Sequence, residues 1–443
     1  MSTVTNNLKW LIYSLCFVVL LGTMNAVLFN VALEDIAKDL SISHSKVSWI
    51  TVGYALVTAI GSMIYGKLAD RFRVKKLFII SIILFILGSI IGFSNQSFVV
   101  VIFARLLQAS GGSAFVALAM VTVARLFTPD EKPRALAMIS SSIALAVGMG
   151  SLVGGAINDT LGWPYLFLIM VISIVGITLL MKFMPKEETH YSNDVFHFDF
   201  LGALLLFGLI ATFLLGVNIN SWLFVFSFVL FFLFRTRMTK AKYPFIDIEL
   251  FKNKVYLRLI TVGFINNTAG LAIILLLPML LVRKHGFLTF SVGICLFIGS
   301  LFGILSSYIT GKTIPKFGNV KMIYISSTVG LVGYLSLGIF SNSNLVVILI
   351  GLSLTIMSYS STQVSLYTLI PNTLKPEKIG VGLGLYNLTN FVGMAFGPAM
   401  ASKTMEITNS FLLSFVVIAI LISLHFILML NMSSLQKRQY QTN

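Results

Sequence analysis

The chain has 443 residues, of which 57% are hydrophobic and only 10% are charged, and its formal net charge is +16. A mean hydropathy of +0.95 excludes a soluble globular domain and indicates a membrane protein. The cations fall in short segments between apolar runs, so the positive balance indicates membrane orientation and not nucleic-acid binding.

The apolar runs are long enough to cross a bilayer as helices. The run at 410–430, for example, reaches the roughly 20 residues that span a bilayer core. Lipid offers no partner for unpaired backbone groups, and the alternating pattern of a membrane β-barrel is missing, so the spans must be helices. Hydropathy and loop residues predict fourteen of them, at 9–33, 46–66, 77–94, 98–122, 139–158, 164–184, 200–218, 220–235, 257–282, 290–310, 322–340, 344–370, 380–402 and 410–431.

The lysines and arginines predict how these helices are oriented. With fourteen spans, 25 of the 31 cations lie on the face that holds both termini, 5 lie on the other face, and Arg105 lies within a span. By the positive-inside rule, both termini are therefore expected in the cytoplasm. Lys9 precedes the first span and no convincing cleavage site follows it, so we expect an uncleaved first helix.

Two pairs of similar segments indicate related halves. GKLADRFRVKK (66–76) is echoed by GKTIPKFGNVK (311–321) at an offset of 245, and AVGMGSLVGG (146–155) shares its small-residue spacing with GMAFGPAMAS (393–402) at an offset of 247. Parallel six-helix repeats around a site near the membrane midplane are a transporter architecture. The predicted parts are a six-helix bundle in 1–186, two inserted helices with their loops in 187–255, and a second six-helix bundle in 256–443.

The same segments resemble motifs of the major facilitator superfamily, specifically its fourteen-helix drug:proton antiporters, and the resemblance covers nearly the whole chain. The loop motif G-x-L-A-D-R-x-G-R-K is matched by Gly66, Leu68, Ala69, Asp70, Arg71 and Lys75, with Arg73 in place of the second glycine. The helix 4 motif R-x-x-Q-G-x-G is matched by Arg105, Gln108 and Gly111, with Ala109 at a glycine position. The antiporter motif G-x-x-x-G-P-x-x-G-G is matched by Gly150, Gly154 and Gly155, with Ala146 and Ser151 replacing its first glycine and its proline.

Two further details resemble gram-positive tetracycline exporters. Asn25 stands in helix 1 where other antiporters of the family have aspartate, and Asp199 matches the motif F-D-x-x-G. Those exporters also carry an acid in helix 13, where this chain reads Val-Gly-Met at 392–394, and an aspartate where this chain has Pro315. The pattern therefore resembles more closely the multidrug exporters that handle quinolones and cationic dyes.

Arg105 and two acids of helix 1 are the candidate proton-coupling residues. The apolar segment SFVVVIFA before Arg105 buries it by roughly 12 Å, and an intramembrane arginine needs a partner. Glu34 and Asp35 lie at a comparable depth, and their side chains point about 100° apart, so only one can readily face a cavity. We prefer Asp35, whose pKa would respond to burial and to its distance from Arg105. The alternative is that the acids end the helix at the interface while Arg105 reaches toward the surface.

The resemblance implies roles for two other motifs. In the family the loop acid, here Asp70 beside Arg71, latches one half to the other by meeting a helix N-terminus and an arginine of the turn between helices 4 and 5, here Arg134. The alternative is a solvated run of charges. The helix 5 glycines are expected to pack closely and seal the protein against proton leak, although ordinary helix packing would also explain them: Gly150, Gly154 and Gly155.

Polar residues inside apolar spans are candidates for lining a substrate cavity, with interhelical hydrogen bonding as the alternative. They are Asn25, Asn30, Tyr54, Gln108, Asn266, Asn267, Tyr359, Gln363, Asn387 and Asn390. Aromatic and methionine side chains around them would suit flat, amphiphilic ligands.

The sequence therefore predicts an all-α membrane protein that exports drugs in exchange for protons across the bacterial cytoplasmic membrane. A tetracycline exporter, or a lipid or metabolite transporter, is the alternative. We expect a monomer that binds small-molecule drugs and contacts lipids, with the proton as coupling ion and no cofactor, metal or nucleic acid. A channel would need a filter ring or subunit symmetry, and an enzyme would need a clustered metal or nucleophile motif, whereas the five histidines are scattered.

Overall fold

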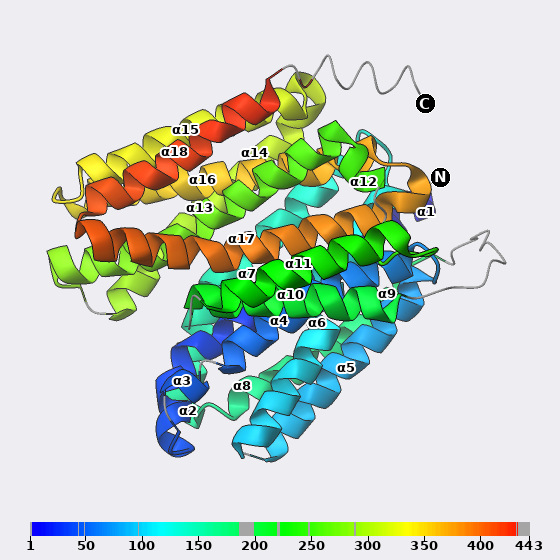
Figure 1. Ribbon diagram of the computed structural model, residues 1–443, viewed down its shortest axis with the longest axis horizontal. Helices are drawn as coiled ribbons and strands as arrows, with labels where there is room; N and C mark the ends of the chain where they lie inside the picture. The colour runs from blue at the N-terminus through cyan, green and yellow to red at the C-terminus, as the bar shows by residue number, and fades with distance from the viewer. Residues whose placement is uncertain are drawn as a thin grey trace. The chain divides into compact units, whose positions relative to one another are not determined.

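The computed structural model describes residues 2–42, 44–47, 49–95, 97–185, 199–218, 222–246, 249–287, 289–430 and 432. All regular secondary structure in these ranges is helical (Figure 1). The chain divides into two compact units, each built from more than one segment. Unit 1 comprises 1–128, 138–193 and 379–385, and unit 2 comprises 129–137, 194–378 and 386–443.

Unit 1 is a helical bundle in which α6 holds a central place. Its elements are α1 (Ser2–Leu28), the 3₁₀ turn η1 (Phe29–Ala32), α2 (Leu33–Asp39), α3 (His44–Val47), α4 (Trp49–Ala69), α5 (Val74–Ser94), α6 (Phe98–Leu126), α7 (Lys132–Leu161) from residue 138 on, α8 (Tyr165–Leu168), η2 (Ile169–Ser173) and α9 (Ile174–Phe183), with the start of α17. α6 packs against α1, α4 and α5, while α9 packs against α1 and α5. A Cβ at Gly88 would lie 2.7 Å from the Ala104 carbonyl oxygen, so α5 and α6 cross with their backbones almost touching.

Unit 2 contains a second bundle and the inserted hairpin. Its elements are α10 (Phe200–Asn218), α11 (Leu223–Lys240), α12 (Glu249–Lys252), α13 (Lys254–His285), α14 (Thr289–Phe317), α15 (Asn319–Ile339), α16 (Leu345–Leu369), η3 (Pro371–Thr373), η4 (Pro376–Lys378), α17 (Ile379–Thr408) from residue 386 on, and α18 (Phe411–Met429), with the first turns of α7. Polar side chains begin several of these helices. Asn253, Asn344 and Ser410 each accept a hydrogen bond from a backbone N–H of the first turn of α13, α16 and α18.

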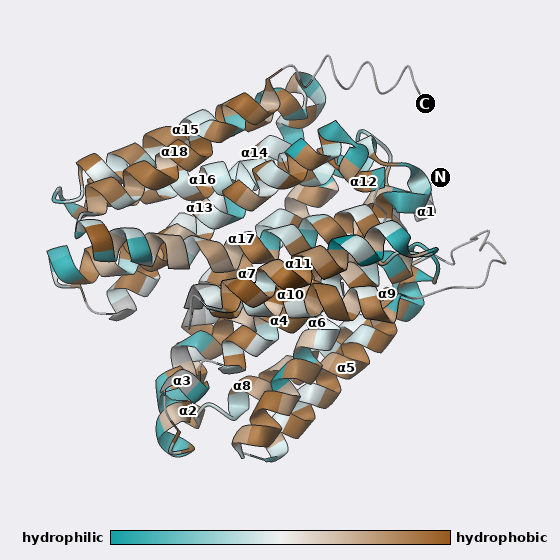
Figure 2. Cartoon of the chain, in the orientation of Figure 1, coloured by the Kyte–Doolittle hydropathy of each residue, from teal (hydrophilic) through white to brown (hydrophobic). Residues whose placement is uncertain are grey.

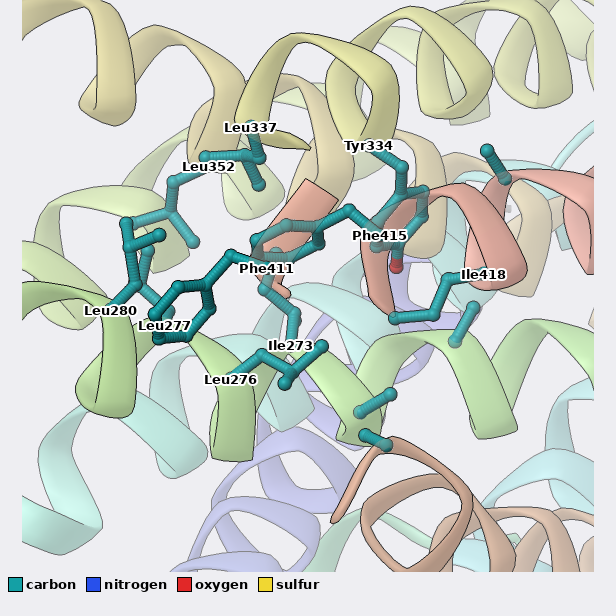
Figure 3. Packing of buried hydrophobic residues seen from close by; sticks show 14 of the residues in the cluster. Ile273, Leu276, Leu277, Leu280, Tyr334, Leu337, Leu352, Phe411, Phe415 and Ile418 are labelled. Atoms are coloured by element: carbon teal, nitrogen blue, oxygen red, sulfur yellow. The ribbon is translucent and has the colours of Figure 1, made fainter. Parts of the chain in front are cut away.

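The core of unit 2 is an apolar cluster with members on α13, α14, α15, α16, α17 and α18. Figure 3 shows Leu276 and Leu280 of α13 among side chains of α15, α16 and α18, including Phe411 and Phe415. The inserted hairpin joins this unit through rings, because Phe396 of α17 stacks on Phe213 of α10, with 6.5 Å between centroids.

The two bundles repeat one packing scheme. In unit 1 the pairs α1–α6, α4–α6, α5–α6, α1–α9 and α5–α9 pack together; in unit 2 the pairs α13–α16, α14–α16, α15–α16, α13–α18 and α15–α18 do so. The small-residue segments also pack on equivalent helices. A Cβ at Gly150 of α7 would lie 3.2 Å from the Met24 carbonyl oxygen of α1, and one at Gly393 of α17 would lie 2.6 Å from the Phe264 carbonyl oxygen of α13. This agrees with the duplication expected from the sequence offsets.

Twelve helices of the described residues are long and apolar enough to cross a membrane. The expected inserted helices exist as α10 and α11, but neither is among these twelve: the apolar stretch of α10 covers Phe200–Phe213, and α11 ends in cations. Figure 2 shows hydrophobic colouring along helices such as α5 and α18 and hydrophilic colouring at α12. The first expected helix, 9–33, is wrong at its end, because α1 stops at Leu28 and η1 and α2 follow.

Candidate functional site

Arg105 of α6 is buried in the membrane part of unit 1, with a side chain only 1% exposed. Its guanidinium lies between two aromatic rings, with Cζ 4.1 Å from the centroids of Phe29 and of Tyr54. Nη1 donates to Gln108 Oε1 at 2.9 Å, and Nη2 donates to the Asn25 carbonyl oxygen at 3.5 Å. In the part of the chain that the structure describes, Nε has no hydrogen-bond partner. The cation is thus held by two ring faces and one short neutral hydrogen bond.

Other polar groups position this cluster. Gln108 donates to Ser89 Oγ at 2.8 Å, and Asn25 Nδ2 donates to the Tyr54 hydroxyl at 3.4 Å. The structure therefore brings Arg105 together with Asn25, Tyr54 and Gln108, three of the residues predicted to line a substrate cavity. Phe29 was not anticipated, although it follows Asn25 by four residues and so shares its helix face.

The expected pair between Arg105 and an acid of helix 1 is not formed in this structure. Asp35 Oδ2 accepts a hydrogen bond from Asn158 Nδ2 at 2.6 Å, its Oδ1 lies 4.0 Å from Lys38 Nζ, and its side chain is 49% exposed. Glu34 is exposed, as is Asn30. No ion pair of the described residues includes Arg105.

The physical reason is the turn η1. A 3₁₀ turn advances about 120° per residue and an α-helix about 100°. Across the four residues Phe29–Ala32, this rotates α2 by roughly 80° from the direction that an unbroken helix would give. The acids are turned toward α7, and Asp39 likewise accepts from Trp163 Nε1 at 2.9 Å.

Asp70, between α4 and α5, caps the first turn of α17 within unit 1. Its carboxylate accepts hydrogen bonds from the backbone N–H groups of Gly380 at 2.9 Å and Val381 at 2.8 Å. These donors have no partner inside their own helix, and a carboxylate there also interacts favourably with the helix dipole. Arg125, at the end of α6, donates to Asp70 at 2.7 Å and to the Ala69 carbonyl oxygen at 2.8 Å.

The arginine in contact with Asp70 is therefore Arg125, and the expectation of Arg134 was wrong for this conformation. Arg134 is exposed and lies in the segment 129–137 that belongs to unit 2, and Arg71 is exposed as well. Arg125 is therefore a partner that sequence reasoning missed, because its position along α6 does not show that its side chain turns toward the loop.

Glycines make the contact of α4 with α17 possible. A Cβ at Gly66 would collide with the Gly380 carbonyl oxygen and would lie 2.9 Å from Gly384 Cα, and a Cβ at Gly384 would lie 2.9 Å from Met63 Cα. This close approach leaves the Asp70 side chain only 10% exposed. This partial burial raises the pKa of its carboxyl to about 6, although the N–H groups of Val381 and Gly380 and the Arg125 guanidinium lower it.

The equivalent contact in unit 2 is built differently. A Cβ at Gly311 of α14 would lie 2.5 Å from Ala137 Cβ and 2.9 Å from the Pro133 carbonyl oxygen, so α14 approaches the start of α7 as α4 approaches the start of α17. At the position equivalent to Asp70 stands Pro315. The packing here is apolar and comes from a small cluster: Ala137, Ile314, Met322 and Val364.

A neutral polar network lies in the membrane part of unit 2. Tyr359 donates its hydroxyl hydrogen to Asn267 Oδ1 at 3.0 Å, and Asn266 Nδ2 donates to the Tyr359 carbonyl oxygen at 3.2 Å. Tyr386 donates to Gln363 Oε1 at 2.6 Å, and Gln363 Nε2 donates to Asn267 Oδ1 at 3.3 Å. Four predicted residues meet here, and Tyr386 is an addition that sequence reasoning missed.

Two further predicted residues, Asn387 and Asn390, are buried on α17, and Asn390 lies beside Gly263, as Tyr386 does. The motif glycines of α7 differ in how closely they pack. Gly150 is in close contact with α1, Gly154 is buried, and a Cβ at Gly155 would meet nothing within 4 Å. Replacing Gly150 would therefore push α7 away from α1.

Asp199 ties together the inserted hairpin. Its Oδ1 accepts from the Gly202 N–H at 3.0 Å and from Arg237 Nη2 at 3.0 Å and Nε at 3.1 Å, and its Oδ2 accepts from the Phe245 N–H at 3.2 Å. Burial favours the neutral acid, but the Gly202, Arg237 and Phe245 donors outweigh it and lower the pKa of Asp199. The carboxylate thus fastens the start of α10 to the end of α11.

Comparison with known proteins gives a consistent picture. Relatives include a riboflavin transporter, RibZ, from Clostridioides difficile (strain 630), 27% identical over 91% of this chain and 90% of that protein. Multidrug resistance protein 3 of Bacillus subtilis (strain 168) is 25% identical over 72% of this chain and 64% of that protein. Among solved structures, the human organic anion transporter MFSD10 has the same fold, with a TM-score of 0.73 at 15% identity, over 95% of this chain and 99% of that one.

The family model of the Major Facilitator Superfamily matches residues 15–398. With the all-helical fold, the repeated packing scheme and the twelve candidate spans, this match shows that the chain belongs to that superfamily of transporters and is not an enzyme.

Proposed function

We propose that this chain is a proton-coupled exporter of amphiphilic drugs in the bacterial cytoplasmic membrane, working by alternating access. The observation that carries the proposal is the buried Arg105, which is clamped between Phe29 and Tyr54 and has an unpartnered Nε. A membrane-buried guanidinium is costly, and such residues mark ion and substrate pathways in transporters. Relatives named as multidrug resistance proteins support drugs as the substrates.

In the proposed cycle, an acid of α2 carries the proton and Arg105 is its partner in the deprotonated state. The described conformation is then one in which Asp35, half exposed and bonded to Asn158, exchanges protons with water. Meanwhile the two rings and Gln108 hold the guanidinium. Glu34, beside it, is the alternative carrier.

The capped start of α17 is the proposed latch of this cycle. Releasing Asp70 from Gly380 and Val381 would free the first turn of α17. We further propose fourteen spans with both termini in the cytoplasm, the hairpin α10–α11 providing the two beyond the twelve described. Thiol labelling of single cysteines introduced near Lys9 and Lys242 would test this orientation, and labelling by an impermeant reagent added outside intact cells would refute it.

Efflux from whole cells tests the function. We expect cells that express the chain to export norfloxacin, ethidium or tetracycline in a manner that a proton uncoupler abolishes. Asp35→Asn, Glu34→Gln and the double variant should lose this export at normal membrane abundance, while Asp39→Asn, on the same helix, serves as the matched control. If both amide variants pump normally, the proton-carrier assignment is refuted; if no probe leaves in an uncoupler-sensitive manner, the drug-export proposal is refuted.

A second candidate is transport of a planar metabolite such as riboflavin. It is favoured by the relative named as a riboflavin transporter, which aligns over 91% of this chain, and by the neutral hydrogen-bonding network around Tyr359 and Gln363. Riboflavin uptake and efflux measured in the same cells separate the two, because a drug exporter should leave the riboflavin content unchanged.

A further inference from the structure

The fixed charges in the membrane part of the described chain are unbalanced. Every acid of the described residues lies outside the twelve candidate spans or within four residues of a span's end. Of all charged side chains in the described residues, only those of Arg105 and Asp199 are buried, and Asp199 is paired with Arg237. Among the described residues of unit 1, Arg105 is therefore a buried cation with no buried anion to balance it.

The geometry around Arg105 leaves one edge of the buried guanidinium poor in hydrogen bonds. Both faces are covered by Phe29 and Tyr54, and Nη1 bonds to Gln108. The edge that carries Nε and Nη2 is left, where Nε is unpartnered and Nη2 has only a 3.5 Å contact to a backbone oxygen. Two parallel N–H groups on one edge of a guanidinium match the two oxygens of a carboxylate.

We propose that Arg105 is the substrate's counter-ion and that the chain favours planar aromatic carboxylates over cationic dyes. This inference rests on the proposed export function and narrows its substrate class. The rings of Phe29 and Tyr54 fix the plane of the guanidinium, so a carboxylate approaching its edge finds both donors already oriented. A cationic ligand would meet a buried like charge with no acid nearby to offset it.

The test compares one acid with its neutral isostere. Nalidixic acid, a planar aromatic monocarboxylate, and its primary carboxamide are measured for binding to purified full-length protein by tryptophan quenching, together with ethidium. We expect the acid to bind at least about tenfold more tightly than the amide, which corresponds to about 1.4 kcal/mol. Arg105→Gln should abolish this preference, Arg105→Lys should retain part of it, and Arg258→Gln, an arginine bonded to the Leu430 carbonyl oxygen, should leave it intact.

Each outcome decides one point. Equal binding of acid and amide by the wild-type protein, or tighter binding of ethidium, overturns the inference even if Arg105→Gln fails to fold. A preference that survives in Arg105→Gln overturns it as well. If the acid binds with the expected preference but no probe is moved by a proton gradient in proteoliposomes, the export proposal fails while the anion site stands.

Discussion

The carboxylate of Asp199 gives a sharp test of how the inserted hairpin is held. Asp199→Asn keeps the shape of the side chain but removes its charge. Its amide NH₂ group, a donor, would also face donors, either the Phe245 N–H or the groups now bonded to Oδ1. The side chain is 1% exposed and receives four hydrogen bonds, so the loss of a buried pair sets the scale. Removing one partner of such a pair costs about 3–5 kcal/mol, and because the Arg237 side chain is 40% exposed we expect about 3 kcal/mol.

Hydrogen–deuterium exchange in detergent measures this effect locally. A loss of about 3 kcal/mol raises the opening constant of the hairpin's end by roughly two orders of magnitude. The backbone amides of 241–246 and of the first turn of α10 should exchange correspondingly faster, whereas Asp130→Asn, at an exposed acid of the same unit, should change nothing. Equal protection in Asp199→Asn and the wild-type protein would refute the reasoning.

The same carboxylate fixes the sign of a pH effect. The pKa of Asp199 is lower in the folded protein than in the unfolded chain, because its backbone and arginine donors favour the ionised form. Its stabilising contribution is therefore complete above about pH 4, the ordinary value for aspartate, and is lost as the pH falls through the lowered pKa. Protection of 241–246 should be flat from pH 8 to pH 5 and should decline only in stronger acid, and Asp199→Asn should remove that decline.

Three further predictions concern the two bundles. Burial raises the pKa of Asp70 to about 6, so the state in which Asp70 caps α17 binds a proton more tightly than a state in which Asp70 is solvated. Acidification from pH 7.5 to 5.5 should therefore increase amide protection in the first turn of α17. Unchanged protection would contradict this. Gly150→Leu should lower the thermal midpoint of the purified protein, because overpacking against α1 costs about 1–3 kcal/mol. Gly155→Leu should be tolerated. Equal midpoints for the two variants would show that α1 moves aside without cost. Tyr386→Phe should cost about 1–2 kcal/mol by leaving Gln363 Oε1 without its donor, and a double-mutant cycle with Gln363→Leu that shows no coupling would exclude this bond.

Much of the fold follows from patterns that the sequence displays directly. The equal offsets of the glycine-rich segments correspond to equivalent contacts, Gly150 on α1 and Gly393 on α13, because small residues are needed wherever two backbones nearly touch. The apolar run before Arg105 placed this arginine in the membrane, and the structure buries it. Length and hydropathy were sufficient for these features because they report depth along a helix.

The features that the sequence did not predict depend on rotation about the helix axis. No proline or glycine marks Phe29–Ala32, so nothing announced the 3₁₀ turn that carries Asp35 away from Arg105. The sequence pointed to Arg134 as the partner of Asp70, whereas the packing of α6 beside α4 brings Arg125 to it. The hairpin α10–α11 has the expected position, but its described apolar length leaves it outside the twelve candidate spans.

Unit 2 has Pro315 at the position where unit 1 has Asp70, and this difference has a thermodynamic consequence. In unit 1 the end of α4 is held by charge, including a partly exposed arginine, and dissolved ions screen such contacts. In unit 2 the end of α14 is held by Ile314, Met322 and their apolar neighbours, whose association weakens on cooling and strengthens with excluded solutes such as sulfate. The two equivalent contacts therefore respond to different conditions: high salt should weaken the contact at the end of α4, and cooling should weaken the contact at the end of α14.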